Sequence, residues 1–377
     1  MIPPGGVIGC LGGGQLGRML GIEARRLGYR FNVFEPGDES PAGQLADSWT
    51  RAEYSDQRAL QTFVDGVDVI TFEFENIPSE VLQQIAECCP VFPQWQVLHI
   101  CQNREREKLF LREHGYPHAD FAVIDSLTGL QEQMKKVGMP SVLKTADFGY
   151  DGKGQIKLNP GVDAAEIWRH FDSDRGVLEQ WVEYECECSV ICARDQQGNL
   201  KAFPVAENIH TNHILDFSII PARISTGLQQ EAVQLASAIT EQLGVVGILG
   251  VECFVTREGT LLVNELAPRT HNSGHYTIDA CVTNQFEQQV RIVAGLPLGD
   301  PSLRSPATMV NILGDAWEER IPPWDKLLGH RATKLHLYGK LDPRAGRKMG
   351  HFTVLEESAE AAYQQARKLK EVFNGQI

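Results

Sequence analysis

Two glutamates, Glu252 and Glu265, are the side chains of this sequence whose type and spacing best suit joint chemistry. They lie in two apolar stretches on either side of a turn, where an acidic side chain is seldom buried without a partner. Like charges that face each other across neighbouring strands destabilise a sheet, so such a pair calls for a cation between the carboxylates. Carboxylate oxygens suit Mg²⁺, which keeps several waters and contacts substrate phosphates, with Mn²⁺ as the alternative. The pair therefore predicts a divalent metal site that serves a phosphorylated substrate.

The pairing of these glutamates depends on the length of the turn between them. Residues 251–256 and 261–266 read as two strands, and Gly259 between them supplies the positive φ that a tight turn needs. A two-residue loop would set Arg257 opposite Thr260 and would bring both glutamates to one face of the sheet. A loop that differs by one residue would separate them to opposite faces. The alternative interpretation is a solvated hairpin that holds no metal.

A dense set of polar side chains follows the second glutamate, namely Arg269, His271, Asn272 and His275. A guanidinium group binds carboxylates and phosphates through paired hydrogen bonds, and an imidazole can gain or lose a proton near neutral pH. These residues predict an anion-binding and proton-handling region beside the metal pair, and a plain polar loop is the alternative.

Size and composition restrict the class of protein. The chain has 377 residues, which favours two or three domains, and its net charge of −14 argues against a general binder of nucleic acid or membrane surfaces. It has no run of 18 apolar residues and no basic segment followed by an apolar one at its amino terminus, so we expect a cytoplasmic protein. Nine scattered cysteines are typical of reduced thiols, and the spacing of Cys186, Cys188 and Cys192 does not match a zinc site.

The amino-terminal region predicts a βαβ unit with a glycine-rich turn. Residues 7–11 read as a strand, Gly12 to Gly17 match GxGxxG at the start of a helix, and residues 31–35 read as the next strand. Taken alone, this pattern suggests a dinucleotide site, with Glu35 as its acidic residue. The physics is more general, because glycines at a helix amino terminus allow any phosphorylated ligand to approach the backbone. A turn that serves only close packing is the alternative.

Two further strands end in side chains that are able to bind ligands. The predicted strand 67–72 leads into Glu73 and Glu75, and ligands of open α/β sheets bind beyond the carboxyl ends of strands. Another predicted strand ends at Lys144 and leads into a loop, residues 145–155, with three glycines and a second lysine. The Walker A pattern GxxxxGK[ST] is absent from the chain, yet this loop is suited to fold over a triphosphate. A flexible hairpin tip is the alternative.

The rest of the chain reads as strands, a linker and a basic turn. Residues 177–182 predict a strand that passes into an acidic linker, residues 183–187, and residues 203–207 predict another strand. His210 and His213 follow outside any clear helix, so a zinc pair is not expected. Residues 344–351 form a basic turn that suits a phosphate, with a solvated turn as the equal alternative. A helix over residues 359–373 closes the chain, and we expect domain boundaries near residues 103 and 298.

Six motifs resemble, in the same order, those of one family: the 5-(carboxyamino)imidazole ribonucleotide synthases of purine biosynthesis, which are ATP-grasp ligases. The motifs are GQLGRM (residues 14–19), FEFENIP (72–78), GYDGKGQ (149–155), ECFV (252–255), NELAPR with HNSGH (264–275) and GRKMGH (346–351). The resemblance covers nearly the whole chain. It implies an α/β fold of ATP-grasp architecture: a doubly wound βαβ domain (1–103), an ATP-grasp domain (104–298) and a small α+β domain (299–377).

The resemblance also implies roles for individual residues. Those expected to contact ATP are Arg104, Lys144, Gly149, Tyr150, Asp151, Gly152, Lys153, Gly154, Gln155, Glu179, Gln180, Trp181, Val182, Glu187, His210, Asn264 and Glu265. Those expected to face aminoimidazole ribonucleotide are Gly14, Gln15, Leu16, Glu73, Arg269, His271, Ser273, Arg347 and Lys348. Glu252 and Glu265 would hold Mg²⁺, and the expected catalytic residues are Lys144, Arg269, His271 and His275. Many ATP-grasp enzymes carry Glu-x-Asn at the second carboxylate, whereas here Ala267 offers no side-chain oxygen.

The implied reaction uses ATP and bicarbonate to carboxylate aminoimidazole ribonucleotide, by way of carboxyphosphate, in the synthesis of IMP. The implied partners are these small molecules and a second copy of the chain in a homodimer, with neither nucleic acid nor membrane. Formate-dependent glycinamide ribonucleotide transformylase shares the architecture and is the nearest alternative. The GxGxxG pattern leaves an NAD-dependent oxidoreductase as an alternative from another class.

Overall fold

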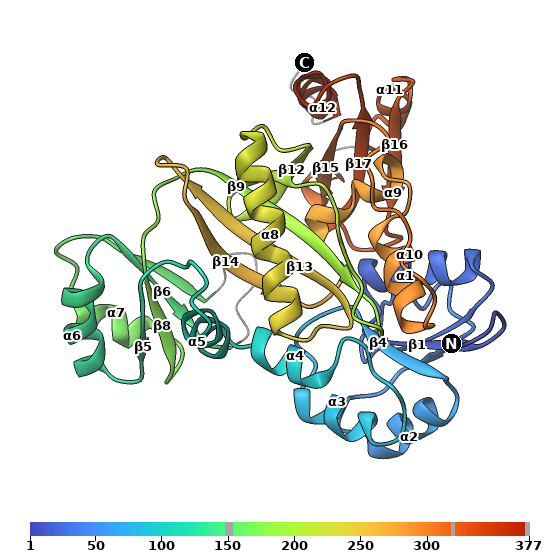
Figure 1. Cartoon of the computed structure of the whole chain (residues 1–377), viewed down its shortest axis with the longest axis horizontal. Coiled ribbons are helices and arrows are strands. Elements are labelled where there is room, and N and C mark those ends of the chain that lie inside the picture. The colour runs from blue at the N-terminus through green and yellow to red at the C-terminus, as the bar shows by residue number, and fades with distance from the viewer. Residues whose placement is uncertain (148–153, 318–320, 374–377) are drawn as a thin grey trace.

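The computed structural model describes residues 1–147, 154–317 and 321–373, and its strands there form three sheets (Figure 1). The first is a parallel sheet of four strands in the order β3-β2-β1-β4. Its strands are β1 (Val7–Leu11), β2 (Arg30–Phe34), β3 (Ser48–Thr50) and β4 (Val69–Phe72). β1 and β4 are buried along their whole length, which is why their sequences are continuous apolar runs. The predicted βαβ unit is confirmed.

Four helices accompany this sheet: α1 (Gln15–Arg26), α2 (Gln57–Asp65), α3 (Ser79–Ala86) and α4 (Trp95–Cys101). The next helix, α5 (Arg104–Glu113), leads out of this region into the second sheet, and Asn103 caps its first turn by accepting a hydrogen bond from the Arg106 amide.

The second sheet is antiparallel, with four strands in the order β5-β8-β6-β7. Its strands are β5 (Phe121–Ile124), β6 (Ser141–Thr145), β7 (Gln155–Leu158) and β8 (Gly176–Gln180). Helices α6 (Leu127–Val137) and α7 (Ala164–His170) pack beside it around a small apolar core that includes Leu130 and Leu143. In Figure 1 this sheet forms a lobe of its own, on the opposite side from the amino-terminal sheet.

The third and largest sheet is antiparallel, and its strand order is β14-β13-β9-β11-β12-β15-β17-β16, with β10 paired to β9. Its strands are β9 (Tyr184–Arg194), β10 (Leu200–Ala202), β11 (Ala206–Thr211), β12 (Ile214–Ile220), β13 (Gly247–Thr256), β14 (Leu261–Ala267), β15 (Ala307–Leu313), β16 (Thr333–Leu337) and β17 (Lys348–Leu355). Its helices are α8 (Thr226–Gln242), η1 (Asn272–Gly274), α9 (Thr277–Ala280), α10 (Gln285–Val293), η2 (Gly314–Trp317), α11 (Trp324–Leu328) and α12 (Ala359–Phe373). The predicted closing helix is confirmed.

The structure corrects three local predictions. The acidic segment 183–187 is not a linker, because β9 already begins at Tyr184. The strand predicted at residues 203–207 lies later, as β11, since Pro204 has no backbone N–H to donate to a ladder. The predicted basic turn ends at Lys348, where β17 begins.

The large sheet runs across residue 298, where a third domain is predicted to start. β12 pairs directly with β15, and Phe217 and Ile219 share an apolar core with Val310 and Phe352. The region after residue 298 therefore extends the central sheet, and the division into three domains stays a prediction.

Helices α1 and α10 tie the amino-terminal sheet to the large one. Leu20 and Ala24 of α1 share a core with Val290 and Val293 of α10. The side-chain amide of Asn284, at the start of α10, donates a buried hydrogen bond to the Glu23 carboxylate at 2.7 Å. In the part of the chain that the structure describes, no helix has both the length and the apolar content needed to cross a bilayer.

Candidate active site

Glu252 and Glu265 are register partners on β13 and β14, as predicted, but the hairpin reaches this pairing by a different route. The turn holds one residue more than predicted: the Thr256 amide donates to the Thr260 carbonyl at 2.9 Å, so the predicted pairing of Arg257 with Thr260 is wrong. This extra residue alone would place the glutamates on opposite faces. A β-bulge at Asn264 shifts the register by one more residue and restores the pairing.

The bulge has a second effect, because it turns consecutive side chains to the same side of the strand. Asn264 and Glu265 both line the cleft, although neighbours in a regular strand point to opposite faces. Helix α5 completes the bulge, where Lys108 donates to the Asn264 carbonyl at 2.9 Å and the Leu266 amide donates to the Glu107 carboxylate at 2.8 Å. Two adjacent helix residues thus satisfy backbone groups of the bulged strand.

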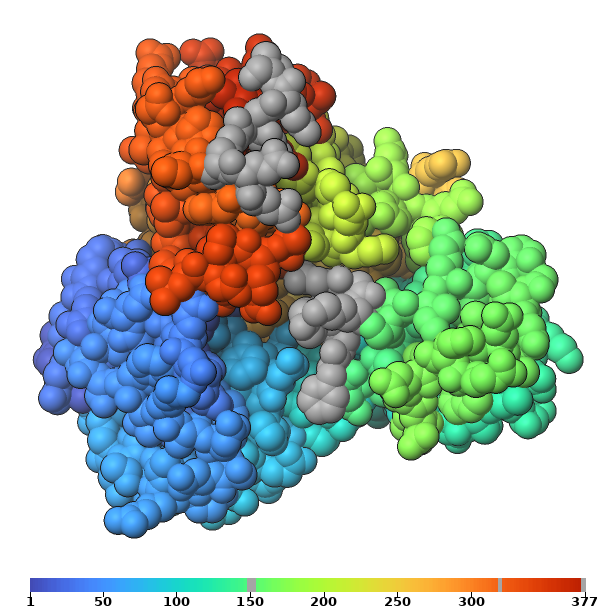
Figure 2. Space-filling model, turned by 180° about the vertical axis from the view of Figure 1, so that it is seen from behind, coloured from blue at the N-terminus to red at the C-terminus, as the bar shows by residue number. Residues whose placement is uncertain are grey.

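The pair opens into a cleft of about 980 Å³ where the three sheets meet (Figure 2). The predicted site residues that line it are Gly14, Gln15, Leu16, Glu73, Arg104, Lys144, Gln155, Glu179, Gln180, Trp181, Val182, Glu187, His210, Glu252, Asn264, Glu265, Arg269, His271, Arg347 and Lys348. Residues from both ends of the chain and from its middle therefore surround one space.

Some predicted residues lie elsewhere. Ser273 and His275 are buried behind the cleft wall, and Gly154 is exposed but is not among the lining residues. Burial lowers the pKa of His275 well below its ordinary value, and the nearby His271 adds to this, so His275 is not suited to exchange protons in the cleft. The predictions for residues 149–153 fall outside the described residues.

Several residues that line the cleft have no role predicted from the sequence: Glu39, Pro41, Phe74, Val142, Tyr184, Asn212, His213, Leu215, Phe254 and Lys340. Phe254 lies two residues after Glu252 on β13, so strand alternation was a signal that could have found it. Glu39 and Lys340 carry no such signal, because they lie in loops from opposite ends of the chain.

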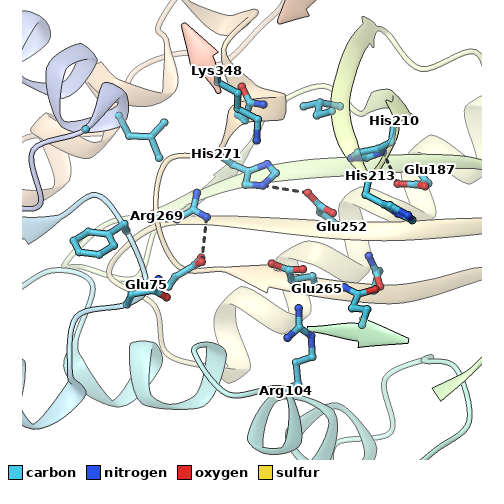
Figure 3. Close-up of a pocket in the computed structure, with 18 of the residues that line it drawn as sticks. Glu75, Arg104, Glu187, His210, His213, Glu252, Glu265, Arg269, His271 and Lys348 are labelled. Atoms are coloured by element: carbon cyan, nitrogen blue, oxygen red, sulfur yellow. Dashed lines mark hydrogen bonds and ion pairs between the residues drawn. The ribbon is translucent and has the colours of Figure 1, made fainter. Parts of the chain in front are cut away.

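The two facing carboxyl groups differ in the direction of their pKa shifts. Burial works to raise the pKa of Glu252, but a hydrogen bond from the imidazole of His271, 3.1 Å away, outweighs it and holds this pKa at about 2. Burial, together with the facing Glu252, raises the pKa of Glu265. The close-up in Figure 3 shows both carboxylates at the same part of the cleft, with Arg104 and Arg269 on either side.

A buried ion triad forms the next part of the cleft. Glu179 on β8 lies 3.0 Å from Lys144 and 3.3 Å from Lys108, measured between carboxylate oxygen and ammonium nitrogen. Burial opposes ionisation of Glu179, yet the two lysines hold its pKa at about 2. Burial lowers the pKa of Lys144, although Glu179 offsets part of this change. Lys144 is therefore held in one place and turned into the cleft.

A flat wall and a polar pair continue the cleft along β8, β9 and β13. Tyr184 and Phe254 stack with their ring centres 4.8 Å apart, and the Lys157 ammonium lies 3.4 Å from the centre of the Trp181 ring. His210 lies 2.7 Å from Glu187, and this carboxylate raises the pKa of the imidazole although burial opposes it. Aromatic faces beside a carboxylate suit a purine ring and its ribose.

The glycine turn of the amino-terminal sheet is already engaged with carboxylates of the chain. The Gly14 and Gly17 amides donate to Glu73 at 2.8 and 3.2 Å, and the Gly13 amide donates to Glu35 at 2.8 Å. A Cβ on Gly14 would lie 2.8 Å from the Glu73 carboxylate, so glycine is needed for this close approach. The amides that a dinucleotide pyrophosphate would use thus bind acidic side chains, which counts against the oxidoreductase alternative.

Cationic side chains after β14 and at the start of β17 face this turn across the cleft. Arg347 pairs with Glu39 at 2.8 Å, and Arg269 pairs with Glu75 at 3.1 Å. Lys348 lies on the same side, above His271 in Figure 3. The cleft therefore has a nucleotide-like end at β8 and β9 and a second, cationic end between the amino- and carboxyl-terminal regions.

Comparison with known proteins decides between the alternatives. Family models match in chain order: a ribonucleotide synthetase preATP-grasp domain at residues 6–102, an ATP-grasp domain at 109–286 and a phosphoribosylaminoimidazole carboxylase C-terminal domain at 307–365. The N5-carboxyaminoimidazole ribonucleotide synthase of Bacillus subtilis (strain 168) is 43% identical over 95% of this chain and 93% of its own length. The chain belongs to the N5-carboxyaminoimidazole ribonucleotide synthase family. This is the family that the sequence motifs indicate, and the predicted ATP-grasp architecture is confirmed.

Solved structures of this family superpose closely on the chain. The crystal structure of an ADP complex of an N5-carboxyaminoimidazole ribonucleotide synthetase has a TM-score of 0.94 and 43% identity, and the match covers 98% of this chain and 97% of that one. The synthase of Aspergillus clavatus in complex with ADP and 5-aminoimidazole ribonucleotide has a TM-score of 0.90 at 29% identity, covering 99% and 100% of the two chains.

Proposed function

We propose that this protein uses ATP and bicarbonate to carboxylate the exocyclic amine of 5-aminoimidazole ribonucleotide, as an ATP-dependent carbon–nitrogen ligase of purine biosynthesis. The observation that carries the proposal is the single cleft that joins a nucleotide-like end to a cationic end through Glu252 and Glu265. A relative of the same fold binds ADP and this ribonucleotide together.

The chemistry explains why one cleft needs both ends. Bicarbonate is a poor electrophile, because attack by the amine would have to expel hydroxide. Transfer of the γ-phosphoryl group of ATP to bicarbonate gives carboxyphosphate, from which phosphate leaves readily, and ADP is released. The amine then forms the new carbon–nitrogen bond. Carboxyphosphate reacts with water, so the two substrates must lie side by side in a shielded space.

The carboxylate pair fits a divalent ion, although no group of three or more acidic, histidine or cysteine ligands occurs among the residues described. A cation between two facing carboxylates offsets their repulsion. The side-chain amide of Asn272, which also lines the cleft, is buried with no hydrogen-bond partner among the described residues, so its oxygen is left for a further contact. Glu252 and Glu265 would hold Mg²⁺, whose bound charge would offset the negative charge of the phosphates.

The other predicted residues receive roles from their places in the cleft. Lys144 contacts the transferred phosphoryl group from the ion triad, since positioning and charge dominate phosphoryl transfer. Glu187 and His210, with the wall around Trp181, hold the adenosine. Arg347 and Lys348 bind the ribonucleotide phosphate, and Arg269 stabilises the charge that develops at the reacting carbon.

The decisive experiment measures ADP release with and without the ribonucleotide and bicarbonate. We expect release that depends on both, and replacement of bicarbonate by formate should give no product. ADP release that needs formate instead would support the transformylase, and binding of NADH without ATPase activity would support the oxidoreductase. We further propose, from the family resemblance, a cytoplasmic homodimer, which sedimentation and fractionation would test.

A further inference from the structure

A line of buried polar side chains runs through the large sheet to His271. The Ser218 hydroxyl donates to the Asn208 carbonyl oxygen at 2.9 Å, and the Asn208 amide donates to the Ser189 hydroxyl at 2.9 Å. The Ser189 hydroxyl donates to the Ser273 hydroxyl at 2.7 Å, and Ser273 Oγ lies 2.8 Å from His271 Nδ1. The line crosses β12, β11 and β9 and ends at the metal pair, because His271 Nε2 lies 3.1 Å from Glu252.

The four side chains before His271 are almost fully buried, with exposed fractions of 0% for Ser218, 5% for Asn208, and 1% for both Ser189 and Ser273. None of them is among the residues that line the cleft. A buried polar side chain in a sheet is costly unless its hydrogen bonds are made, and here each one is satisfied by the next. The line thus connects the interior of the sheet to a single imidazole.

The direction of these hydrogen bonds is fixed at the imidazole end. The Ser273 backbone amide also approaches His271 Nδ1, at 3.3 Å, and a backbone N–H can only donate. Nδ1 must therefore accept, so the imidazole proton is on Nε2. The Ser273 hydroxyl donates to Nδ1 as well and accepts from Ser189, which accepts in turn from the Asn208 amide. The opposite direction would set two N–H donors against each other at Nδ1.

The main chain of His271 is held as firmly as its ring. The buried Gln285 side chain, at the start of α10, accepts from the His271 amide at 2.9 Å and donates to the His271 carbonyl at 2.7 Å. A Cβ on the neighbouring Gly274 would lie 2.7 Å from the Gln285 amide, so the segment packs directly on this clamp. The clamp thus fixes the backbone from which the imidazole reaches Glu252 and Ser273.

We propose that the Ser218–Asn208–Ser189–Ser273 line locks His271 into the tautomer that carries its proton on Nε2, so that His271 is a positioning residue that directs one oxygen of Glu252. Both ring nitrogens are then engaged, and the second oxygen of Glu252 stays available to a ligand in the cleft. The first part stands on geometry alone, and the consequence for catalysis rests on the proposed function. Ser273 serves His271 from behind, without touching the ribonucleotide.

The tautomer is measured directly by NMR of the ligand-free protein labelled with ¹⁵N-histidine, with His271 assigned through a His271→Gln variant. We expect a protonated-type shift at Nε2 and an unprotonated-type shift at Nδ1. In Ser273→Ala the lock is weakened, and we expect a mixture of tautomers, whereas Ser273→Thr keeps the hydroxyl and should keep the wild-type pattern. The matched control is Thr308→Val, which removes a buried hydroxyl on the adjacent strand β15 that has no hydrogen-bond partner among the described residues.

A second variant is designed to reverse the direction of the hydrogen bonds along the line without removing a side chain. In Asn208→Asp the carboxylate only accepts, so Ser189 turns its proton toward residue 208 and Ser273 loses its donor. We expect the His271 signal of this variant to shift toward the Nδ1-protonated form. If circular dichroism shows that Ser273→Ala is not folded, Asn208→Asp alone is compared with the wild type. A wild-type spectrum with the proton on Nδ1, or an unchanged spectrum in the folded variants, would overturn the lock.

Activity gives an independent measurement. Ser273→Ala should raise the Mg²⁺ concentration for half-maximal ADP release by up to about 10-fold, the low end of the effect of losing a direct partner of a metal ligand, because Ser273 acts through His271. The KM for the ribonucleotide should not change, because Ser273 does not line the cleft; a raised KM would restore it as a substrate contact. If the chain shows the expected tautomer but no ribonucleotide-dependent ADP release, the lock stands and the proposed function fails.

Discussion

At the scale of single residues, the cleft pairs each reactive group with a partner of defined charge. Glu252 is ionised by its contact with His271, whereas the pKa of Glu265 is raised by burial and by Glu252. The sequence predicts these carboxylates and Lys144 because their chemistry is visible in the residue types. It does not predict that Ser273 faces away from the cleft, since neighbours in an irregular loop have no fixed alternation.

Glu265→Gln should lower ATP cleavage by at least about 100-fold, because one of two carboxylates for the divalent ion is lost. ADP release at saturating Mg²⁺ measures this. Without metal the variant should be as stable as the wild type or more so, by about 0.2–1 kcal/mol, since the facing like charges no longer repel. Glu258→Gln, in the exposed turn of the same hairpin, is the control. Full activity in Glu265→Gln would remove the metal assignment.

Lys348→Ala should raise the KM for the ribonucleotide by about 10-fold to 100-fold, the effect of losing a charged hydrogen bond, and should leave the KM for ATP within about 2-fold. Steady-state kinetics with each substrate varied in turn gives both values. Lys334→Ala removes an exposed lysine from the neighbouring strand β16 and should change neither. An equal effect on both substrates would show that Lys348 does not distinguish the two ends of the cleft.

At the scale of elements, the hairpin β13–β14 shows which features a sequence pattern predicts and which it does not. Both strands are predicted, and so is the pairing of Glu252 with Glu265, but the loop length is wrong by one residue and the bulge at Asn264 compensates for it. The bulge is stabilised by contacts with residues distant in the sequence, here Glu107 and Lys108 of α5. The local sequence pattern therefore does not predict it. His210 was missed as a strand residue for a similar reason, because β11 contains an irregular pairing at Ile209 and His210.

The support of the bulge by α5 predicts a dependence of stability on pH. Burial raises the pKa of Glu107 to about 8, with Lys108 acting against it. The folded protein keeps this proton up to about pH 8, while the unfolded chain releases it above about pH 4.3, so the wild type loses stability as the pH rises through this window. Glutamine does not titrate. The free energy of unfolding of Glu107→Gln, relative to that of the wild type, should therefore increase as the pH rises.

Denaturant unfolding at about pH 5.5 and about pH 7.5 measures this difference, which should grow by about 2 kcal/mol. For Glu113→Gln, at the exposed end of the same helix, the free energy of unfolding should change with pH as it does in the wild type. Parallel curves for Glu107→Gln would show that Glu107 is already ionised in the folded protein.

At the scale of the whole molecule, the cleft requires parts that are far apart in the sequence. The glycine turn of α1, the hairpin β13–β14 and the start of β17 surround one space, and the pairing of β12 with β15 joins the last region to the central sheet. The sequence indicates the fold class through its motifs. It does not indicate that the sheet continues past residue 298, because strand patterns do not reveal which strands are neighbours.

A chain cut after residue 298 should fail to fold into a stable unit. The cut removes the partner of β12 and the apolar residues that cover Phe217 and Ile219. We expect the full-length chain to show no separate melting transition for residues 299–373 by calorimetry, and we expect the fragment 1–298 to aggregate or to bind hydrophobic dyes. A soluble fragment with a cooperative melt would establish the predicted third domain as an independent unit.

The pairing of β12 with β15 also has a consequence for how the protein is made. A ribosome synthesises β12 well before it reaches β15, so while residues 221–306 are being made the nascent chain presents an open strand edge that its later partner cannot yet cover. The ribonucleotide cannot assist folding at this stage, since β17, with Lys348 at its start, is made later still. Chaperones that shield strand edges should therefore influence the yield of this enzyme more than the supply of its substrates does.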